Sequence, residues 1–295
     1  KEFLLYKIIR LISDYIYFIK ILINNKYDVV HLNPSLKSKA ILRDGIFILI
    51  IKLFSNAKIV VFFHGWERKF WNLICKRYNF LFKGIFHKTD SIIVLSNEYK
   101  NLLIQNGYKE NIFLGSAAID DNYMTNLQGQ KKYNMNKKKN ILFLSRFEKE
   151  KGIYIILDLI KIINKESNDF IFRLVGKGPE YYNFKAEIDE LKFENVHLMG
   201  HINDELKQNV FMQSDIFLFP TYYPEGMPAC ILEAMFFGLS VITRNVGAMN
   251  DFFINNKMGY MTSSKDPDIF LELLNNSIKE NKFIEMGEYN RKYAK

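Results

Sequence analysis

The chain of 295 residues is 48% hydrophobic and 15% aromatic, enough apolar material for two ordinary domains, which excludes a disordered chain. Its two cysteines, Cys75 and Cys230, exclude a disulfide framework and favour a reducing cytoplasm. The net charge of +9 lies entirely in residues 1–120, which hold 18 Lys and Arg against 9 Asp and Glu. This asymmetry predicts an anionic partner for the first half, and the alternative is a lysine-rich, solvated surface.

The earliest apolar stretch, Phe3–Ile23, carries Lys7, Arg10, Asp14 and Lys20. These charges recur too often for a helix that spans a bilayer. We expect no signal peptide before this stretch, which opens close to Lys1. The sequence therefore predicts a soluble or peripheral protein.

Apolar, β-rich runs alternate with amphipathic segments through the first half. Strands are expected at Tyr27–Leu32, Lys58–Phe63, Ser91–Leu95 and Ile112–Leu114, and helices at Ala40–Phe54, Glu67–His87 and Glu98–Asn106. This alternation predicts a parallel sheet that helices cover on both faces.

A stretch rich in Asn, Gln and Lys, Asp121–Lys139, is expected to be a linker. A second series of strands follows it, at Asn140–Leu144, Phe170–Val175, Val196–Leu198, Ile216–Phe219 and Ser240–Thr243. We therefore predict an α/β protein with two doubly wound domains, residues 1–120 and 140–295, that face a cleft. Ligands of such sheets bind beyond the carboxyl ends of the strands.

Two cations, Arg146 and Lys151, follow the strand that ends at Leu144, in a loop whose next helix begins near Gly152. A helix N-terminus attracts anions, and the guanidinium fork and the ammonium both suit a diphosphate. The alternative is a solvated loop in which lysines and glutamates pair with each other.

Two carboxylates follow the strand Ile216–Phe219. Glu225 lies in a loop, and Pro228 suits the first turn of a helix that carries Glu233 about two turns in. A carboxylate on a mostly apolar helix needs partners, which ligand hydroxyls would supply. Backbone N–H groups of Gly226 and Met227 would face the same space. The alternative for Glu233 is an ordinary surface position.

Three other motifs are weaker indicators. His64 follows the strand Lys58–Phe63, but a lone histidine is more often structural. Gly176 and Gly178 lack the rest of a dinucleotide-binding fingerprint. Asp268, in an Asp-Pro-Asp sequence, is expected to cap a helix or lie in its first turn. No His or Cys cluster has metal-ligand spacing, so we expect no metal and no cofactor.

A set of motifs occurs in order through residues 140–262. They are Leu144-Ser145-Arg146, Lys151-Gly152, Val175–Pro179, Val196–Gly200, Asp215–Thr221, Glu225–Pro228, Glu233–Met235, Gly238–Ile242 and Val246–Ala248. As a set they resemble the retaining glycosyltransferases of family 4, which have the GT-B fold of two Rossmann-like domains. The first half resembles that family more loosely, at Tyr27–His31, Val60–Gly65 and Ser91–Ser96.

The resemblance implies roles for the matched residues. Arg146 and Lys151 would hold the diphosphate of a nucleotide-sugar donor, UDP- or GDP-linked, and Glu225 would bind the transferred sugar. Glu233 would bind the ribose, and His64 would lie near the reacting sugar. The remaining donor contacts would come from Gly226, Met227, Pro228, Gly176, Gly178, Gly200, His201 and Ile202, with residues 200–202 beside the base.

The implied activity is that of a retaining hexosyltransferase, which we expect to need no metal because no metal-ligand cluster is found in the sequence. It would move a sugar to a saccharide or lipid-linked acceptor in cell-surface polysaccharide synthesis. We expect a cytoplasmic enzyme that binds no nucleic acid and lies on the inner face of the plasma membrane, held by basic and aromatic residues between Arg68 and Lys88. The alternative there is that the aromatic rings are core and the lysines are solvated.

Two departures from the family pattern predict a chain truncated at both ends. No glycine-rich loop precedes Tyr27, and the chain stops after Asn290–Lys295, before a final crossing helix finishes. The alternative functions are a GT-B-type nucleotide-sugar epimerase, a glycogen-type synthase and a non-catalytic nucleotide-sugar-binding module.

Overall fold

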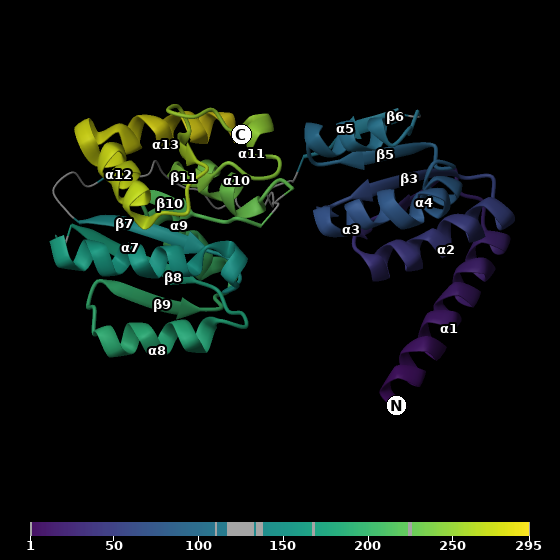
Figure 1. The fold of residues 1–295 in the computed structure, drawn as a ribbon, viewed down its shortest axis with the longest axis horizontal. Helices are drawn as coiled ribbons and strands as arrows, with labels where there is room; N and C mark the ends of the chain where they lie inside the picture. The colour runs from purple at the N-terminus through teal and green to yellow at the C-terminus, as the bar shows by residue number, and fades with distance from the viewer. Residues whose placement is uncertain are drawn as a thin grey trace. The chain divides into compact units, whose positions relative to one another are not determined.

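A computed structural model of the chain describes residues 2–109, 111–116, 133, 138–166, 169–223 and 226–294. It divides into two compact units (Figure 1). The first comprises Lys1–Ser116 with Pro224–Gly226, and the second comprises Ala117–Tyr223 with Met227–Lys295. Each unit has its own sheet and its own apolar core. The predicted linker, residues 121–139, lies outside the described residues except for positions 133, 138 and 139.

The first unit is built on a four-stranded parallel sheet of order β1-β3-β5-β6. Its strands are β1 (Val29–Leu32), β3 (Lys58–Phe63), β5 (Ser91–Val94) and β6 (Asn111–Leu114). Its helices are α1 (Glu2–Asn24), α2 (Ser38–Phe54), α3 (Arg68–Leu73), the π-helical η1 (Ile74–Tyr78), α4 (Asn79–Phe86) and α5 (Asn97–Gln105). Two further strands of two residues each, β2 (Ser35–Leu36) and β4 (Gly65–Trp66), follow β1 and β3 in the chain. They pair with each other in parallel as a separate small sheet.

The predicted strands of this unit are confirmed to within two residues, and the helix predicted at Glu67–His87 is confirmed as a continuous helical stretch, Arg68–Phe86. What the prediction missed is the π turn η1, which divides this stretch into α3 and α4. Core packing continues across the break, because the ring centroids of Trp71 and Phe82 lie 5.6 Å apart and those of Phe82 and Phe86 lie 4.8 Å apart. The π turn therefore interrupts the helix without interrupting its aromatic contacts.

The second unit is built on a six-stranded parallel sheet of order β12-β11-β10-β7-β8-β9. Its strands are β7 (Lys139–Leu144), β8 (Phe170–Val175), β9 (Val196–Gly200), β10 (Ile216–Phe219), β11 (Ser240–Arg244) and β12 (Gly259–Thr262). Its helices are the 3-10 turn η2 (Lys149–Lys151), α7 (Ile153–Glu166), α8 (Tyr181–Leu191), α9 (Asp204–Gln213), α10 (Ala229–Phe236), α11 (Met249–Phe252), α12 (Pro267–Ile278), the 3-10 turn η3 (Lys279–Asn281) and α13 (Lys282–Tyr293).

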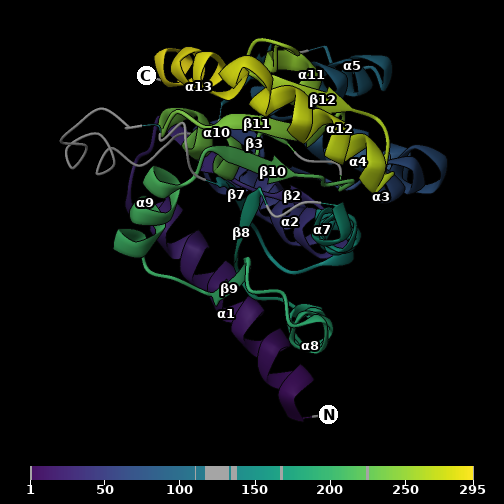
Figure 2. The ribbon, with the colours of Figure 1, turned by 90° about the vertical axis from the view of Figure 1, so that its left-hand side faces the viewer.

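Helices cover both faces of this sheet, with α7 and α8 on one side and α9 and α10 on the other (Figure 2). Strands buried on both faces read as continuous apolar runs, as β10 does with all four of its residues buried. All five residues of β11 are buried as well, although Ser240, Thr243 and Arg244 are polar. The predicted strands are confirmed here as well. Strand β12 was missed, because it is short and begins with Gly259.

The Asp-Pro-Asp sequence caps a helix, as predicted. Asp266 is the N-cap of α12, and its side chain accepts a hydrogen bond from the backbone N–H of Asp268, at 3.1 Å. Asp268 thus lies in the first turn of the helix. Among the described residues, no helix has both the length and the apolar character needed to cross a bilayer.

Candidate functional site

The carboxyl ends of all six strands of the second unit lie at one edge of its sheet, because the strands are parallel. The loops that leave β7, β8 and β9 are joined there by backbone hydrogen bonds. Phe147 N–H donates to the Lys177 carbonyl at 3.1 Å, and Gly176 N–H donates to the Gly200 carbonyl at 2.7 Å. This edge is where a doubly wound sheet binds its ligands.

Lys151 ends the turn η2 and is only 9% exposed. Its ammonium lies over two aromatic rings, 4.9 Å from the centroid of Tyr223 and 5.8 Å from that of Phe219. The helix α7 starts two residues later, at Ile153, so the positive end of its dipole lies close by. The solvated loop that was the alternative interpretation does not describe this lysine.

A single carbonyl anchors the turn that carries Lys151. The Glu150 oxygen accepts the backbone N–H of Tyr222 at 2.8 Å and that of Tyr223 at 3.1 Å. It also accepts the hydroxyl of the buried Thr221 at 3.1 Å. The turn after β7 is thereby fixed to the loop after β10. Burial and the nearby Glu150 carboxylate raise the pKa of Tyr222.

Arg146 lies in a different environment, because its side chain is 71% exposed. Its guanidinium pairs with the Glu148 carboxylate at 2.8 Å. This contact is the kind that the alternative interpretation of the loop predicted, and exposed pairs of this kind contribute little to stability. A diphosphate would have to compete with Glu148 for the guanidinium.

The glycines of the second unit bring the loops at this edge into close contact. A Cβ on Gly176, whose φ is +132°, would lie 1.9 Å from the Ser145 carbonyl oxygen. A Cβ on Gly178 would lie 2.4 Å from the Phe147 carbonyl oxygen. These two glycines therefore have a packing role, whatever they contact in a ligand.

Glu233 lies in the second turn of α10 and is 9% exposed. Its Oε1 pairs with the Nζ of Lys207, on α9, at 2.6 Å. The surface position that was the alternative for this carboxylate is therefore wrong. The predicted helix is confirmed, since Pro228 is the N-cap of α10 and Gly238, with a φ of +74°, follows its end.

The other predicted donor residues divide between the loops of this region. Gly200 is buried at the end of β9, followed by the exposed His201 and the half-buried Ile202. Gly226, Met227 and Pro228 lead into α10. Glu225 lies outside the described residues.

His64 belongs to the first unit, where it directly follows β3. It is exposed, and its Nε2 is hydrogen-bonded to the Ser35 hydroxyl at 2.9 Å. The histidine thus lies at the carboxyl edge of the first sheet, as predicted, held by Ser35 at the start of β2. Ser35 was missed, although its place just after a strand ending at Leu32 was a usable signal.

Sequence reasoning also missed three residues of the second unit, namely Phe219, Tyr223 and Lys207. The two rings belong to an aromatic-rich run after β10, which was a usable signal for a cation nearby. Nothing in the sequence singled out Lys207, because it is one of many lysines on amphipathic helices.

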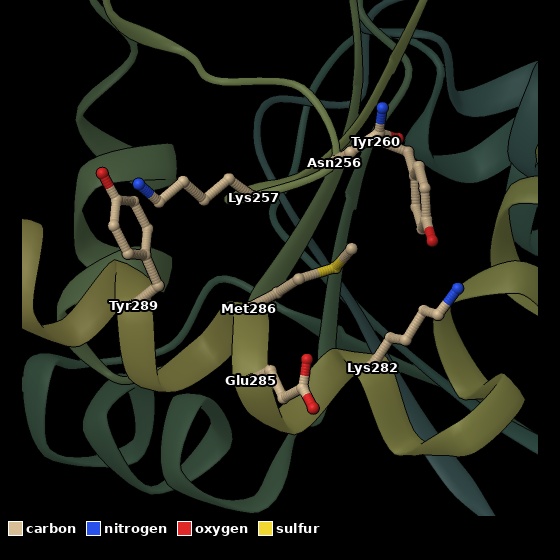
Figure 3. Close-up of a pocket in the computed structure, with 7 residues that line it drawn as sticks. All are labelled: Asn256, Lys257, Tyr260, Lys282, Glu285, Met286 and Tyr289. Atoms are coloured by element: carbon tan, nitrogen blue, oxygen red, sulfur yellow. The ribbon is translucent and has the colours of Figure 1, made fainter.

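A cavity of about 310 Å³ lies between α13 and the start of β12 (Figure 3). Lys257 lies over the ring of Tyr289, 4.4 Å from its centroid. Lys282 and Glu285 project from α13, the helix that also carries Tyr289, and line the same cavity. None of the predicted site residues lines it. It adjoins the amino end of β12, the sheet edge opposite to the predicted site.

Within the described ranges, no group of three or more His, Cys, Asp or Glu side chains is placed to hold a metal ion. Metal independence stays a prediction, because Glu225 and the linker are outside those ranges.

A sequence profile of the family described as "Glycosyl transferases group 1" matches residues 127–295. The chain belongs to this family. Relatives named as glycosyltransferases accompany this match, and together they support transferase activity for this group 1 glycosyl transferase. The expected α/β fold with parallel sheets is also confirmed, by the sheets themselves and by likeness to a solved glycosyltransferase from Rickettsia africae.

Three similar proteins illustrate the relationship. An uncharacterised 41.2 kDa protein in the cps region of Klebsiella pneumoniae is 26% identical over 271 residues, which cover 89% of this chain and 72% of that protein. A UDP-Gal:alpha-D-GlcNAc-diphosphoundecaprenol alpha-1,3-galactosyltransferase of Escherichia coli is 33% identical over 36% of this chain and 27% of its own. Anabaena HepE, solved with UDP and glucose, has a TM-score of 0.72 at 16% identity, covering 96% of this chain and 76% of that one.

The match to the curated relatives is partial. The chain spans 72%, 58% and 53% of the lengths of three of them. Their names therefore describe proteins that are longer than this chain.

Proposed function

We propose that the chain transfers a sugar, with retention of configuration, from a nucleotide-diphosphate sugar to a saccharide or lipid-linked acceptor in cell-surface polysaccharide synthesis. The observation that carries this proposal is the buried Lys151, whose cation lies at the carboxyl edge of a doubly wound sheet. The family match and the likeness to HepE, solved with UDP and glucose, support the same assignment.

The proposed chemistry follows from where charge grows during the reaction. As the glycosidic bond breaks, negative charge accumulates on the leaving diphosphate, and fixed cations stabilise it without reorganising. Lys151 and Arg146 supply these cations, so no metal ion is required of the site. Glu225 would hold the transferred sugar and Glu233 the ribose, so that attack comes from one direction. His64 would lie beside the reacting sugar.

A thermal-shift screen of UDP- and GDP-linked sugars identifies the donor, because binding raises stability by a term logarithmic in ligand concentration over Kd. The donor so found is then incubated with saccharide and lipid-linked acceptors, and free nucleotide is measured. We expect nucleotide release that depends on the acceptor. An altered sugar formed without acceptor would indicate the epimerase instead, and binding with no turnover would indicate the non-catalytic module.

We further propose that the first unit docks on an anionic membrane from the cytoplasmic side. No Asp or Glu occurs between Arg68 and Lys88. The rings in this segment divide into two groups: Trp71, Phe82 and Phe86 are core, against the interfacial interpretation, but Phe80 is 88% exposed. The exposed residues that we call the basic apolar patch are Lys69, Leu73, Lys76, Arg77, Tyr78, Phe80, Leu81 and Lys83.

The patch combines the two features of an interfacial segment, cations for headgroups and apolar side chains for the acyl boundary. The name of the E. coli relative includes a diphosphoundecaprenol acceptor, which is consistent with a lipid surface. Arg68 is not part of this patch, because it pairs with Glu98 at 2.6 Å.

Co-sedimentation with vesicles tests the membrane proposal. Reversing Lys76 and Arg77 to Glu removes two cations, each worth about 1 kcal/mol, so partition onto phosphatidylglycerol vesicles should fall by at least about thirtyfold. The control reverses two other exposed lysines of the same unit, Lys37 and Lys39. Vesicle binding that does not depend on phosphatidylglycerol content or salt, or that falls equally in both variants, would contradict the proposal that the basic apolar patch binds the membrane.

A further inference from the structure

The ion pair between Glu233 and Lys207 is largely shielded from water. The side chain of Glu233 is 11% exposed and that of Lys207 is 20% exposed, and their charged atoms lie 2.6 Å apart. Only Oε1 of the carboxylate takes part in this contact. Within the described part of the chain, Oε2 of Glu233 makes no hydrogen bond, yet it is not among the buried polar atoms that lack a partner. One oxygen is therefore fixed and the other faces accessible space.

The pair joins two segments that sequence reasoning assigned to different parts of a nucleotide. Lys207 is the fourth residue of α9, which directly follows residues 200–202, predicted to border the base. The start of α9 is itself fixed, because the Asn203 side chain caps it by accepting the Leu206 N–H at 3.0 Å. Glu233 lies on α10, predicted to bind the ribose. The contact thus connects the helix that follows the predicted base-binding residues 200–202 to the carboxylate that is predicted to bind the ribose.

An ammonium group only donates hydrogen bonds, so Lys207 cannot replace the carboxylate as an acceptor for ligand hydroxyls. What it does is hold one carboxylate oxygen, and with it the rotamer of Glu233. A carboxylate with so little exposed surface needs such a partner. With Oε1 held, the second oxygen is aimed for a neighbouring pair of ligand O–H groups, which is what the 2′ and 3′ hydroxyls of a ribose present.

We propose that Lys207 is a positioning residue for nucleotide recognition, which sets Glu233 to select ribose by its hydroxyl pair. This inference rests on the proposed function, since it assumes that a nucleotide diphosphate is the ligand. It adds a residue that lies outside the matched motifs and acts through Glu233.

The experiment compares the Kd values of UDP, GDP and their 2′-deoxy forms for the whole chain and for Lys207→Met, Lys207→Arg and Glu233→Gln. Losing a charge-assisted contact should weaken binding of the preferred ribonucleotide by about tenfold to a hundredfold in Lys207→Met. The 2′-deoxy form should weaken less, so the ratio between the two falls towards one. Lys207→Arg, which keeps a cation, should restore most of this ratio.

Lys207→Met leaves the carboxylate without its cation and is expected to lower stability, so the double variant Lys207→Met/Glu233→Gln serves as the folded reference. If the two residues act as a unit, the double variant should bind no more weakly than Glu233→Gln alone. Additive losses, or an unchanged ratio of ribo to deoxy affinity in Lys207→Met, would overturn the positioning role while leaving the proposed function in place. Failure of the unmodified chain to bind any of the four nucleotides would overturn both.

Discussion

Replacing Lys151 by Met separates a role in binding from a role in folding. Methionine keeps the unbranched stem among Phe219 and Tyr223 but removes the charge. In the folded protein the ammonium gains a contact with two rings, worth about 0.5–2 kcal/mol, and this offsets part of its loss of hydration. Because methionine removes both the ring contact and the cost of dehydrating the ammonium, the two changes oppose each other, and we expect the free energy of unfolding to change by about 1 kcal/mol or less.

Binding should respond differently. A diphosphate that bonds to this ammonium loses a charge-assisted hydrogen bond in Lys151→Met, worth about 1.5–3 kcal/mol, or roughly 10- to 150-fold in Kd. Calorimetric titration with UDP and GDP measures this loss, and chemical denaturation measures stability. The loss should be larger for a nucleoside diphosphate than for the corresponding monophosphate, because Lys151 is assigned to the diphosphate.

The same turn supplies a matched control. Lys149 lies two residues away, is 62% exposed and comes within 3.8 Å of Glu180, so Lys149→Met removes the same charge from solvent. We expect it to change nucleotide affinity by less than about threefold, the size of an exposed ion pair. Equal effects of the two substitutions, or unchanged affinity in a folded Lys151→Met, would refute the reasoning that the buried cation binds the diphosphate.

Three other predictions concern packing, metals and pH. Gly178→Ala should cost about 1–3 kcal/mol of unfolding free energy in chemical denaturation, because its Cβ would lie 2.4 Å from a carbonyl oxygen, whereas Gly84→Ala, with nothing within 4 Å, should not destabilise. Transfer activity should persist in EDTA, and a complete loss that Mg²⁺ or Mn²⁺ reverses would contradict the metal-free site. Burial lowers the pKa of His87, so the unfolded chain binds its proton first, and stability should fall as pH drops from about 6.5 through the folded-state pKa. Denaturation across this range should show a flatter profile in His87→Phe, since one proton contributes at most about 1.4 kcal/mol per pH unit.

Much of the fold was predictable, because buried parallel strands are short apolar runs whose pattern depends only on neighbouring residues. Strands β3, β8 and β10 match their predicted ranges. The π turn η1 was not predictable in this way. Residues on both sides of it favour a helix, and only the packing of Trp71 against Phe82 in the folded core shows that the two segments hold together across it.

The sequence motifs identified the residues of the predicted site, but they did not show how buried each side chain is or what it contacts. Arg146 and Lys151 look alike in the sequence, yet one is 71% exposed and paired with Glu148 while the other is 9% exposed and lies over aromatic rings. The difference comes from Tyr223, which is 72 positions beyond Lys151 in the chain. Burial of this kind depends on which loops pack against each other in the fold, and the residues next to Lys151 in the sequence do not predict that.

The meeting of these loops bears on how a donor would be held. The Glu150 carbonyl, which accepts three hydrogen bonds from Thr221, Tyr222 and Tyr223, fixes the turn of Lys151 to the loop after β10. That loop leads on toward α10, and so to Glu233, whose partner Lys207 stands on the helix that follows β9. The proposed contacts of Lys151 and Glu233, and the positioning contact of Lys207, therefore come from elements that follow strand ends of one sheet. Sites supported in this way hold their groups more accurately than sites on loops alone, which is the condition for charge stabilisation to act without reorganisation.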